Sequence, residues 1–493
     1  MARSRVLSIQ RAKYDLLQQR AFVKELTSFE VTLIRQMVDE PTWLKPPDES
    51  TLRWALSLAR VSEVVVQESS RQIAVDIGHA TDMYRQKLYQ CLKPCFNKDT
   101  HVKRDVVPKQ IEKIFQLLKT ERAALLKLYG DRLPASALDQ AVRQRPLSLA
   151  LGGGGGSGYI FLGAMLELED AGLRPDVIVG SSMGAILGAF RAMNSAFKVE
   201  EMRQLISSLS WSRVFRLFER KSRFGVPATL SLYLREVIGH EFENEKGFKS
   251  LADMDIPLRV IVAGLKNVEG ESEADFGQYA HLLDETATNP LNLRKRATGI
   301  LKTVVDFARR PIKRITLGLN DATSGFDVLD AIGFSASVPG MIHYDIERDD
   351  ERMVGMVNDL LVREGVSRLF DGGFADNLPA LGAWYAAQDG TLGQRDPMVL
   401  AFDCFAPQIS RHLIFLPLMR LAAENSREGR EVAHLTVAFK KVLSPLHVVP
   451  KADAFLRVVQ NGRNETRPHI PFIRKMVGPI PDPPHLFDVS DDS

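Results

Sequence analysis

The first candidate for chemistry in this chain is a serine flanked by glycines. Ser182 lies within Gly180–Gly184, which reads Gly-Ser-Ser-Met-Gly and fits the pattern G-x-S-x-G. Glycines on both sides permit a sharp strand-to-helix turn that pushes the serine hydroxyl into the open. A helix that follows directly would point its unpaired N–H groups at this hydroxyl. The pattern predicts acyl transfer, with Ser182 as the nucleophile.

A glycine-rich loop lies about two dozen residues upstream of this serine. Gly152–Gly158 contains no side chain larger than that of serine, so its backbone N–H groups are open to a ligand. Such donors stabilise the oxyanion of a tetrahedral intermediate. The loop and the serine turn together predict an anion-binding site beside a nucleophile.

Four elements must position these two loops. Leu147–Leu151 and Val177–Val179 are short apolar runs that we interpret as buried strands. Tyr159–Ala171 and Ala185–Met193 have helical patterns, and each follows one of the loops. A strand–helix–strand crossover is right-handed and makes the strands parallel, so both loops lie at the same edge of the sheet.

Three other readings of the glycine loop remain open. Gly153, Gly155 and Gly158 also fit the dinucleotide pattern G-x-G-x-x-G, but that fold expects an acid at the end of the second strand, where this chain has Gly180-Ser181. A P-loop needs Gly-Lys-Ser/Thr, and here Tyr159 follows the last glycine. A plain structural turn is the third reading.

The serine also needs a base, and Asp371 is the candidate. It follows an apolar strand end and is flanked by Gly372 and Gly373, which leave its carboxylate unobstructed. A carboxylate can accept the proton directly if it lies within hydrogen-bonding reach of the hydroxyl. An Asp-Gly turn is the competing reading. None of the later histidines lies at a strand end or among glycines; they are His412, His434, His447, His469 and His485.

Residues 146–405 resemble the patatin-like phospholipases. The resemblance is carried by four motifs in the family's order: the glycine loop, the Gly180–Gly184 turn, the Ser335–Gly340 segment, and Asp371-Gly372-Gly373 continuing to Asn377 and Pro379. It implies an α/β fold, a three-layer α/β/α sandwich with a mainly parallel central sheet.

The resemblance also implies the role of each site residue. Ser182 would be the nucleophile and Asp371 the base of a Ser–Asp dyad without histidine. The oxyanion hole would be made by the backbone of Gly153, Gly154 and Gly155, with the N–H of Met183 after the turn. Gly158, Gly180, Gly184, Gly372 and Gly373 support the motifs. Ser157 is a departure, because the family usually carries Arg or Lys there.

Composition sets the limits of the prediction. The chain has 493 residues, 45% hydrophobic and 25% charged, which is ordinary for a globular protein of two or three domains. No apolar run is long enough to span a bilayer, and the basic N-terminus lacks the apolar core of a secretory signal. A net charge of +3 does not suggest nucleic acid as a partner. Three cysteines make no disulfide framework, and Cys91 and Cys95 lack a second pair for a metal, so we expect a cytoplasmic protein without metal or cofactor.

Three domains are expected. Residues 1–145 carry periodic apolar segments at about 5–38, 50–70, 73–93 and 108–129 and a short helix from Ala135, and predict a helical region. Residues 146–410 would form the catalytic domain, with a mainly helical stretch at 198–240, a strand at Ile256–Ala263 and an insertion at about 270–325. Residues 411–493 would be a helical extension that ends, from Pro471, in a loose tail.

The insertion contains a basic segment, residues 292–315. It carries eight basic residues against one acid, Asp306, and seven apolar residues fall on one helical face from Leu293 to Ala308. This pattern predicts peripheral contact with a membrane surface, or an ordinary surface helix packed on the domain.

The sequence thus predicts a lipid acyl hydrolase that acts on lipid esters. Two rivals remain: a catalytically silent lipid-binding or scaffold protein, and a Ser–His–Asp hydrolase with an essential histidine.

Overall fold

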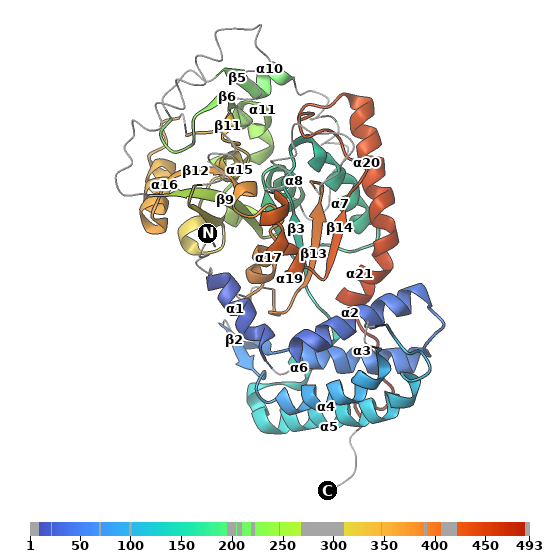
Figure 1. The fold of residues 1–493 in the computed structure, drawn as a ribbon. Coiled ribbons are helices and arrows are strands. Elements are labelled where there is room, and N and C mark those ends of the chain that lie inside the picture. The colour runs from blue at the N-terminus through green and yellow to red at the C-terminus, as the bar shows by residue number, and fades with distance from the viewer. Residues whose placement is uncertain are drawn as a thin grey trace. The chain divides into compact units, whose positions relative to one another are not determined.

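The structure is a computed structural model. It describes residues 9–488, apart from 21, 69–70, 98–100, 195–203, 205–209, 218–221, 246, 268–309, 347, 389, 391 and 406–421. The chain divides into two compact units (Figure 1). Unit 1 comprises Met1–Leu147, Trp384–Met398 and Pro468–Ser493, and unit 2 comprises Ser148–Ala383 and Val399–Arg467. The segment after residue 410 is therefore shared between the two units.

Unit 2 is built on a mainly parallel sheet with the order β10-β9-β4-β3-β13-β14. Strands β3, β4 and β9 pair in parallel, as do β13 and β14, whereas β10 and β12 run antiparallel to β9. The parallel pairing of the first two predicted strands is confirmed, with Leu149 opposite Ile178. The strands are β3 (Leu147–Leu151), β4 (Val177–Ser181), β9 (Leu258–Lys266), β10 (Ile312–Leu317), β12 (Val366–Asp371), β13 (Met398–Asp403) and β14 (Leu435–Ala438).

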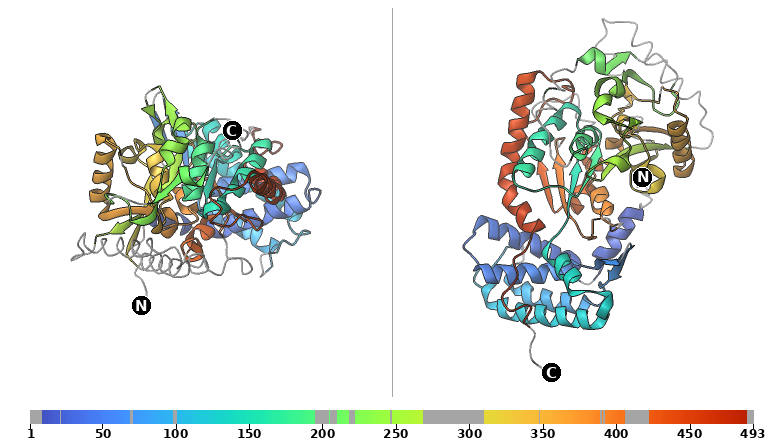
Figure 2. Two further views of the ribbon diagram at one scale, coloured as in Figure 1. Left: turned by 90° about the horizontal axis from the view of Figure 1, so that it is seen from above. Right: turned by 180° about the vertical axis from the view of Figure 1, so that it is seen from behind.

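Helices cover both faces of this sheet. Successive strand residues face opposite sides, so Ile178 and Val179 of β4 mark the two faces. A Cβ added at Gly188 of α8 (Met183–Ala192) would lie 3.0 Å from Ile178 Cγ2, and one at Gly382 of α17 (Ala380–Ala386) would lie 3.3 Å from Val179 Cγ1. The three-layer α/β/α arrangement follows. Helix α20 (Ala452–Thr466) lies along α7 (Ile160–Asp170) (Figures 1 and 2).

A second, small sheet in unit 2 has the order β11-β6-β5. It comprises β5 (Phe215–Leu217), β6 (Ala228–Leu232) and β11 (Gly340–His343). The prediction of a mainly helical stretch at 198–240 is wrong at β5 and β6. Strand β6 pairs with β5 on one side and on the other with β11, which lies more than a hundred residues later. The remaining elements here are α10 (Trp211–Val214), α11 (Leu234–Ile238), the β7 (Glu243–Asn244) and β8 (Gly247–Phe248) hairpin, α14 (Asp321–Ser324), α15 (Val328–Ser335), α16 (Glu351–Glu364) and α19 (Arg427–Val432).

The predicted basic segment falls mostly outside the described residues, which resume at Arg310. Its last part is not helical: Ile312–Leu317 form β10, an edge strand of the main sheet. Lys313 pairs with Glu364 at 2.9 Å and Arg314 pairs with Asp376 at 3.0 Å. Two of the eight basic residues therefore serve the fold of unit 2.

Unit 1 is mainly helical, as predicted, but also contains a β-hairpin. Strands β1 (Glu63–Glu68) and β2 (Arg71–Asp76) pair antiparallel within the segments predicted to be helical, because the β-branched run Val64–Val66 favours a strand. The helices are α1 (Ile9–Gln18), α2 (Val23–Asp39), α3 (Pro46–Arg60), α4 (Asp82–Leu92), α5 (Ile111–Tyr129), α6 (Ala135–Arg143) and α21 (Ile470–Val477).

The expected loose tail is ordered as far as Asp488. Helix α21 buries Ile473, and Ile480 and Leu486 are buried beyond it. Arg53 donates to the Lys475 carbonyl at 2.6 Å and Trp54 Nε1 to the Pro481 carbonyl at 3.0 Å. The tail is thus part of the core of unit 1, and its prolines end the helix without releasing the chain.

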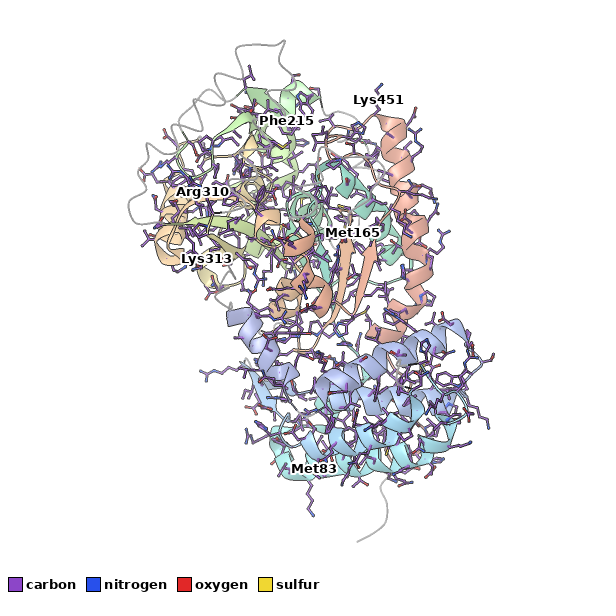
Figure 3. All side chains as sticks on the ribbon, in the orientation of Figure 1. Met83, Met165, Phe215, Arg310, Lys313 and Lys451 are labelled. Carbon is purple, nitrogen blue, oxygen red and sulfur yellow. The ribbon has the colours of Figure 1, made fainter. Side chains whose placement is uncertain are left out.

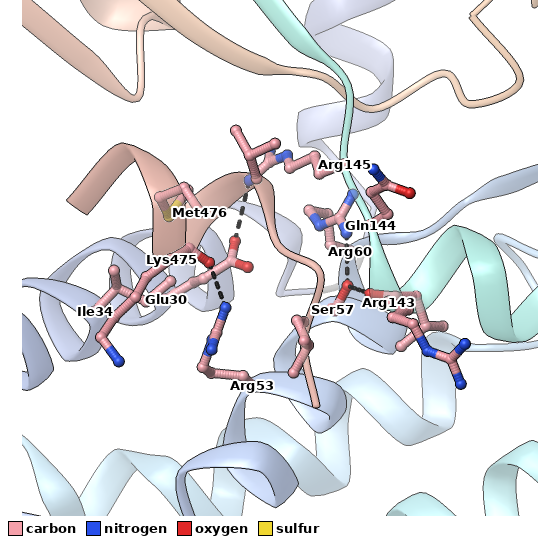
Figure 4. Close-up of a pocket in the computed structure, with 13 residues that line it drawn as sticks. Glu30, Ile34, Arg53, Ser57, Arg60, Arg143, Gln144, Arg145, Lys475 and Met476 are labelled. Carbon is pink, nitrogen blue, oxygen red and sulfur yellow. Dashed lines mark hydrogen bonds and ion pairs between the residues drawn. The ribbon is translucent and has the colours of Figure 1, made fainter. Parts of the chain in front are cut away.

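A buried polar network joins the segments of unit 1 (Figure 4). The Arg145 side chain is 2% exposed and lies 3.5 Å from both Glu30 and Asp396. Arg60 also pairs with Asp396, at 2.9 Å. The network therefore ties residues before Leu147 to the Trp384–Met398 segment.

No helix in the described chain is long and apolar enough to cross a membrane.

Candidate active site

Ser182 occupies a strained turn between β4 and α8. Its φ of 53° and ψ of −126° are rare for a residue with a side chain. A Cβ at Gly184 would lie 2.3 Å from the Leu151 carbonyl oxygen, so only glycine lets the start of α8 approach β3. The turn has the sharp strand-to-helix geometry predicted from the sequence, with Ser182 at its apex.

Asp371 reaches this turn because β4 and β12 share one edge of β9. Ser181, the last residue of β4, pairs with Ile261, and Asp371, the last residue of β12, pairs with Val262. Strand β10 occupies the other edge of β9 over the same stretch. The parallel β4 and the antiparallel β12 therefore meet end to end, and the residues at their ends become neighbours.

The structure brings the predicted nucleophile and base into direct contact. Ser182 Oγ donates to Asp371 Oδ2 at 2.6 Å, and the backbone N–H of Gly373 donates to Oδ1 at 2.8 Å. Burial raises the pKa of Asp371 to about 6, although the hydrogen bonds from Ser182 and Gly373 act to lower it. Asp371 is 4% exposed and Ser182 is 8% exposed. This is the geometry of a general base held against a hydroxyl.

The end of α15 and the residues just after it hold both Ser182 and Asp371, a link that sequence reasoning missed. Ser335 Oγ donates to the Ile261 carbonyl at 2.6 Å and accepts from the backbone N–H of Ser182 at 2.9 Å. The Ser337 carbonyl accepts from the N–H of Asp371 at 2.9 Å. The motif Ser335–Gly340 was visible in the sequence, but only the fold reveals that it links the two strand ends.

The expected oxyanion donors are not equivalent. The N–H of Gly153 donates to the Asn377 carbonyl at 3.0 Å, so it is already engaged. Within the described chain, the N–H groups of Gly154, Gly155 and Met183 make no hydrogen bond. Gly155 has φ 54°, a conformation that favours glycine. Of the expected oxyanion donors, the N–H groups of Gly154, Gly155 and Met183 therefore remain unengaged.

The position that departs from the family pattern is bonded to the chain near Leu443. Ser157 is 1% exposed, and its Oγ donates to the Leu443 carbonyl at 2.8 Å. Gly158 packs beneath the turn, where an added Cβ would lie 2.6 Å from Met183 Cγ. Ser157 thus fixes the glycine loop to the chain near Leu443.

The turn that follows Asp371 is anchored on both sides. A Cβ at Gly372 would lie 2.2 Å from the Ile261 carbonyl oxygen, so this position needs glycine. Asn425 Nδ2 donates to the carbonyls of Gly373 and Phe374 at 3.2 and 2.6 Å.

Asp376, in the same turn, is a second buried acid. Burial raises the pKa of Asp376 to about 6, while Arg314 acts to lower it.

Ser182 and Asp371 lie in a mainly apolar pocket of about 140 Å³ within unit 2. Such a lining suits an acyl chain, with few polar groups beside the reacting atoms. Glycine-loop residues Gly154 and Gly155 and the polar side chain of Asn377 complete one wall. The apolar lining consists of Trp211, Phe215, Leu230, Val338, Met341, Ile342, Phe374, Phe405, Ala422, Pro445, Leu446 and Val448.

No described histidine makes a hydrogen bond or ion pair with Ser182 or Asp371. His343 is buried, with Nδ1 2.9 Å from the Val226 carbonyl oxygen, and His434 Nδ1 accepts from the N–H of Val399 at 3.1 Å. His412 lies outside the described residues. Among the residues whose placement is described, no group of three His, Cys, Asp or Glu side chains could hold a metal ion.

Comparison with known families agrees with the predicted resemblance. Residues 149–384 match the family model described as patatin-like phospholipase, so this stretch is a domain of that family. The match spans both strand ends that carry Ser182 and Asp371. No curated protein matches the chain.

Proposed function

We propose that this protein hydrolyses carboxylic esters of lipids, including phospholipids, through a Ser182–Asp371 dyad. The observation that carries the proposal is the 2.6 Å hydrogen bond from Ser182 Oγ to Asp371 Oδ2 inside an apolar pocket. The family match supports a lipid acyl hydrolase. The dyad and its oxyanion hole are the finer part of the proposal.

In the first half-reaction, Ser182 Oγ attacks the ester carbonyl while Asp371 Oδ2 takes its proton. The carbonyl oxygen becomes an oxyanion, which the N–H groups of Gly154, Gly155 and Met183 can stabilise. The N-terminus of α8 adds a favourable dipole at this point. Collapse of the intermediate releases the alcohol, which takes the proton from Asp371, and leaves an acyl group on Ser182.

In the second half-reaction, Asp371 accepts a proton from water as the water attacks the acyl carbonyl. The new oxyanion occupies the same donors, and its collapse returns the proton to Ser182 and frees the acid. The hydrogen bond from Gly373 keeps Oδ1 fixed, so Oδ2 faces the reacting oxygen in both halves.

Reaction with a fluorophosphonate and ester hydrolysis test the proposal. We expect labelling at Ser182 in the wild type, and negligible turnover of a lipid ester in Ser182→Ala, Asp371→Asn and the double variant. The losses should not add, because the two residues act on one proton transfer. Ser148→Ala is the matched control, since Ser148 is a buried serine of β3 whose Oγ has no hydrogen-bond partner.

Each rival function predicts a different outcome of these measurements. A silent scaffold would show no labelling in folded protein. A Ser–His–Asp hydrolase would lose turnover in a single histidine variant, such as His343→Ala or His412→Ala, without a change in thermal melting. Substantial turnover in Asp371→Asn would mean that another group deprotonates Ser182.

The basic segment, residues 292–315, is proposed to assist at anionic membrane surfaces. Each cation near such a surface contributes on the order of 1 kcal/mol to binding, and salt weakens this contribution by screening. Reversing Arg309 and Arg310 to Glu should lower co-sedimentation with anionic vesicles but not with neutral ones.

The proposed compartment is the cytoplasm, since all three cysteines are free and buried.

A further inference from the structure

The small sheet carries a row of apolar side chains from the pocket to the protein surface. Leu230 of β6 is paired with Ile342 of β11 on one side and with Leu217 of β5 on the other. Leu230 and Ile342 line the pocket, whereas Leu217 is 64% exposed. Leu217 also shares a strand face with Phe215, which is buried in the pocket wall. The apolar row therefore runs from two residues that line the pocket to one that is exposed.

Two further apolar side chains both line the pocket and reach solvent. Trp211 of α10 is 48% exposed, and its ring centroid lies 4.6 Å from that of Phe215. Leu446, in the chain between β14 and α20, is 49% exposed. We call Trp211, Leu217 and Leu446 the pocket rim. Most large apolar residues in the described part of the chain are buried, so two exposed ones that line the pocket and a third paired with its lining mark a contact surface.

We propose that the pocket rim docks on a lipid surface, so that an ester passes from the lipid layer into the pocket without crossing water. This inference depends on the proposed function only in assigning a lipid ester to the pocket; docking itself needs no catalysis. Tryptophan favours the membrane–water interface because its ring is apolar while its N–H can remain hydrated. Leucine side chains beside it would enter the acyl region.

Charges at the same end of unit 2 fit this occupant. Arg213 is exposed on α10 beside Trp211 and makes no ion pair with any described residue. Lys451, exposed just before α20, lies at the same end of unit 2 as Phe215 (Figure 3). Cations around an apolar patch can meet lipid phosphates while the patch enters the layer.

Vesicle binding by the Ser182→Ala protein tests the docking without hydrolysis. We expect it to float with phosphatidylcholine vesicles, and to remain bound at 0.5 M salt because apolar contacts are not screened. Leu217→Asp or Leu446→Asp in this background should each weaken binding about tenfold. Val362→Asp is the matched control: Val362 of α16 in unit 2 is 83% exposed but lies outside the rim, and its variant should bind as before.

Tryptophan quenching locates the contact. Of the four tryptophans, Trp54 and Trp384 are buried and Trp43 is half-buried with its Nε1 bonded to the Arg104 carbonyl. Brominated phosphatidylcholine should therefore quench the emission of the Ser182→Ala protein, and Trp211→Phe should remove most of this quenching.

Several results would overturn the docking proposal. They are no binding to phosphatidylcholine vesicles, an equal loss in Val362→Asp, or quenching that survives Trp211→Phe. A dimer in light scattering that Leu217→Asp dissociates would assign the rim to a second copy of the chain instead. If fluorophosphonate labels Ser182 but the protein does not bind vesicles, only the docking proposal is contradicted. If binding depends on the pocket rim but Ser182 is not labelled, only the proposed hydrolysis is contradicted.

Discussion

Asp371 is buried and is also the proposed general base. The residue is 4% exposed and its carboxylate accepts two hydrogen bonds, yet burial raises its pKa to about 6. The higher pKa makes the Asp371 carboxylate a stronger base than that of an exposed aspartate. At neutral pH this carboxylate is still ionised in most protein molecules. The residue thus gains basicity from an environment that disfavours its charge.

The pH dependence of hydrolysis should report this residue. Since only ionised Asp371 can accept the proton of Ser182, we expect kcat/KM to rise with pH through an apparent pKa near 6 and then level off. Turnover of a soluble ester between pH 4.5 and 8.5 measures it. A profile that is flat from pH 4.5 upward would contradict a buried carboxylate base.

Asp371→Asn should also stabilise the protein at neutral pH. The pKa of Asp371 is raised above its unfolded value, so the folded state binds the extra proton between about pH 4 and pH 6, and stability falls as pH rises through that window. Removing the charge removes a penalty of up to about 3 kcal/mol. We expect thermal melting of Asp371→Asn to exceed the wild type at pH 7.5, with a smaller difference at pH 4.5. The opposite trend would show that the charge is stabilising.

At the scale of elements, strand β9 decides the site. It aligns the end of β4 with the end of β12 through consecutive residues, Ile261 and Val262. Ser335, at the end of α15, bonds to the Ile261 carbonyl and to the N–H of Ser182. Three elements distant in sequence therefore fix the position of one hydroxyl.

Ser335→Ala should misplace the nucleophile. It leaves the buried N–H of Ser182 and the Ile261 carbonyl without this partner, which costs about 1–3 kcal/mol of stability. We expect at least a tenfold fall in kcat, because small displacements of a reacting atom are expensive. The control is Ser337→Ala, whose Oγ donates only to the Phe334 carbonyl at 2.7 Å. Equal kcat values in the two variants would argue against a positioning role.

At the scale of the whole molecule, unit 1 is assembled from three separated segments. Its N-terminal helices are joined to Trp384–Met398 through Arg60 and Asp396. Arg53 joins them to α21, and Trp54 joins them to Pro481 beyond it. Unit 1 therefore cannot reach its final core until the end of the chain is present.

Truncation of the C-terminus tests this dependence. Ending the chain after His469 removes Phe472, Ile473 and Met476 from the core, and loss of a buried side chain costs about 2–5 kcal/mol. We expect this variant to lose the melting transition of unit 1 in calorimetry. Ending the chain after Asp488 is the control and should leave melting unchanged. Unchanged melting after the longer deletion would restore the interpretation of a loose tail.

The sequence by itself determined the elements whose signals are local. The strand Leu147–Leu151, the glycine loop, the turn around Ser182 and the start of α8 were all predictable, because glycine positions and apolar periodicity depend on neighbouring residues. The Asp371 turn was also visible, although its partner was inferred from family resemblance.

Only the tertiary structure decided which residues distant in sequence are in contact. The pairing of β6 with β11 and of β10 with β9 joins residues far apart in the sequence, so β6 was mistaken for helix and β10 was assigned to an insertion. The β1–β2 hairpin is a local pairing, and it was missed because its apolar residues were interpreted as helical. Other non-local contacts put Ser335 against Ser182, engage the N–H of Gly153 with Asn377, and bury the tail after Pro471. A local pattern carries no record of these contacts, because hydrogen bonds and burial depend on partners that only the folded chain supplies.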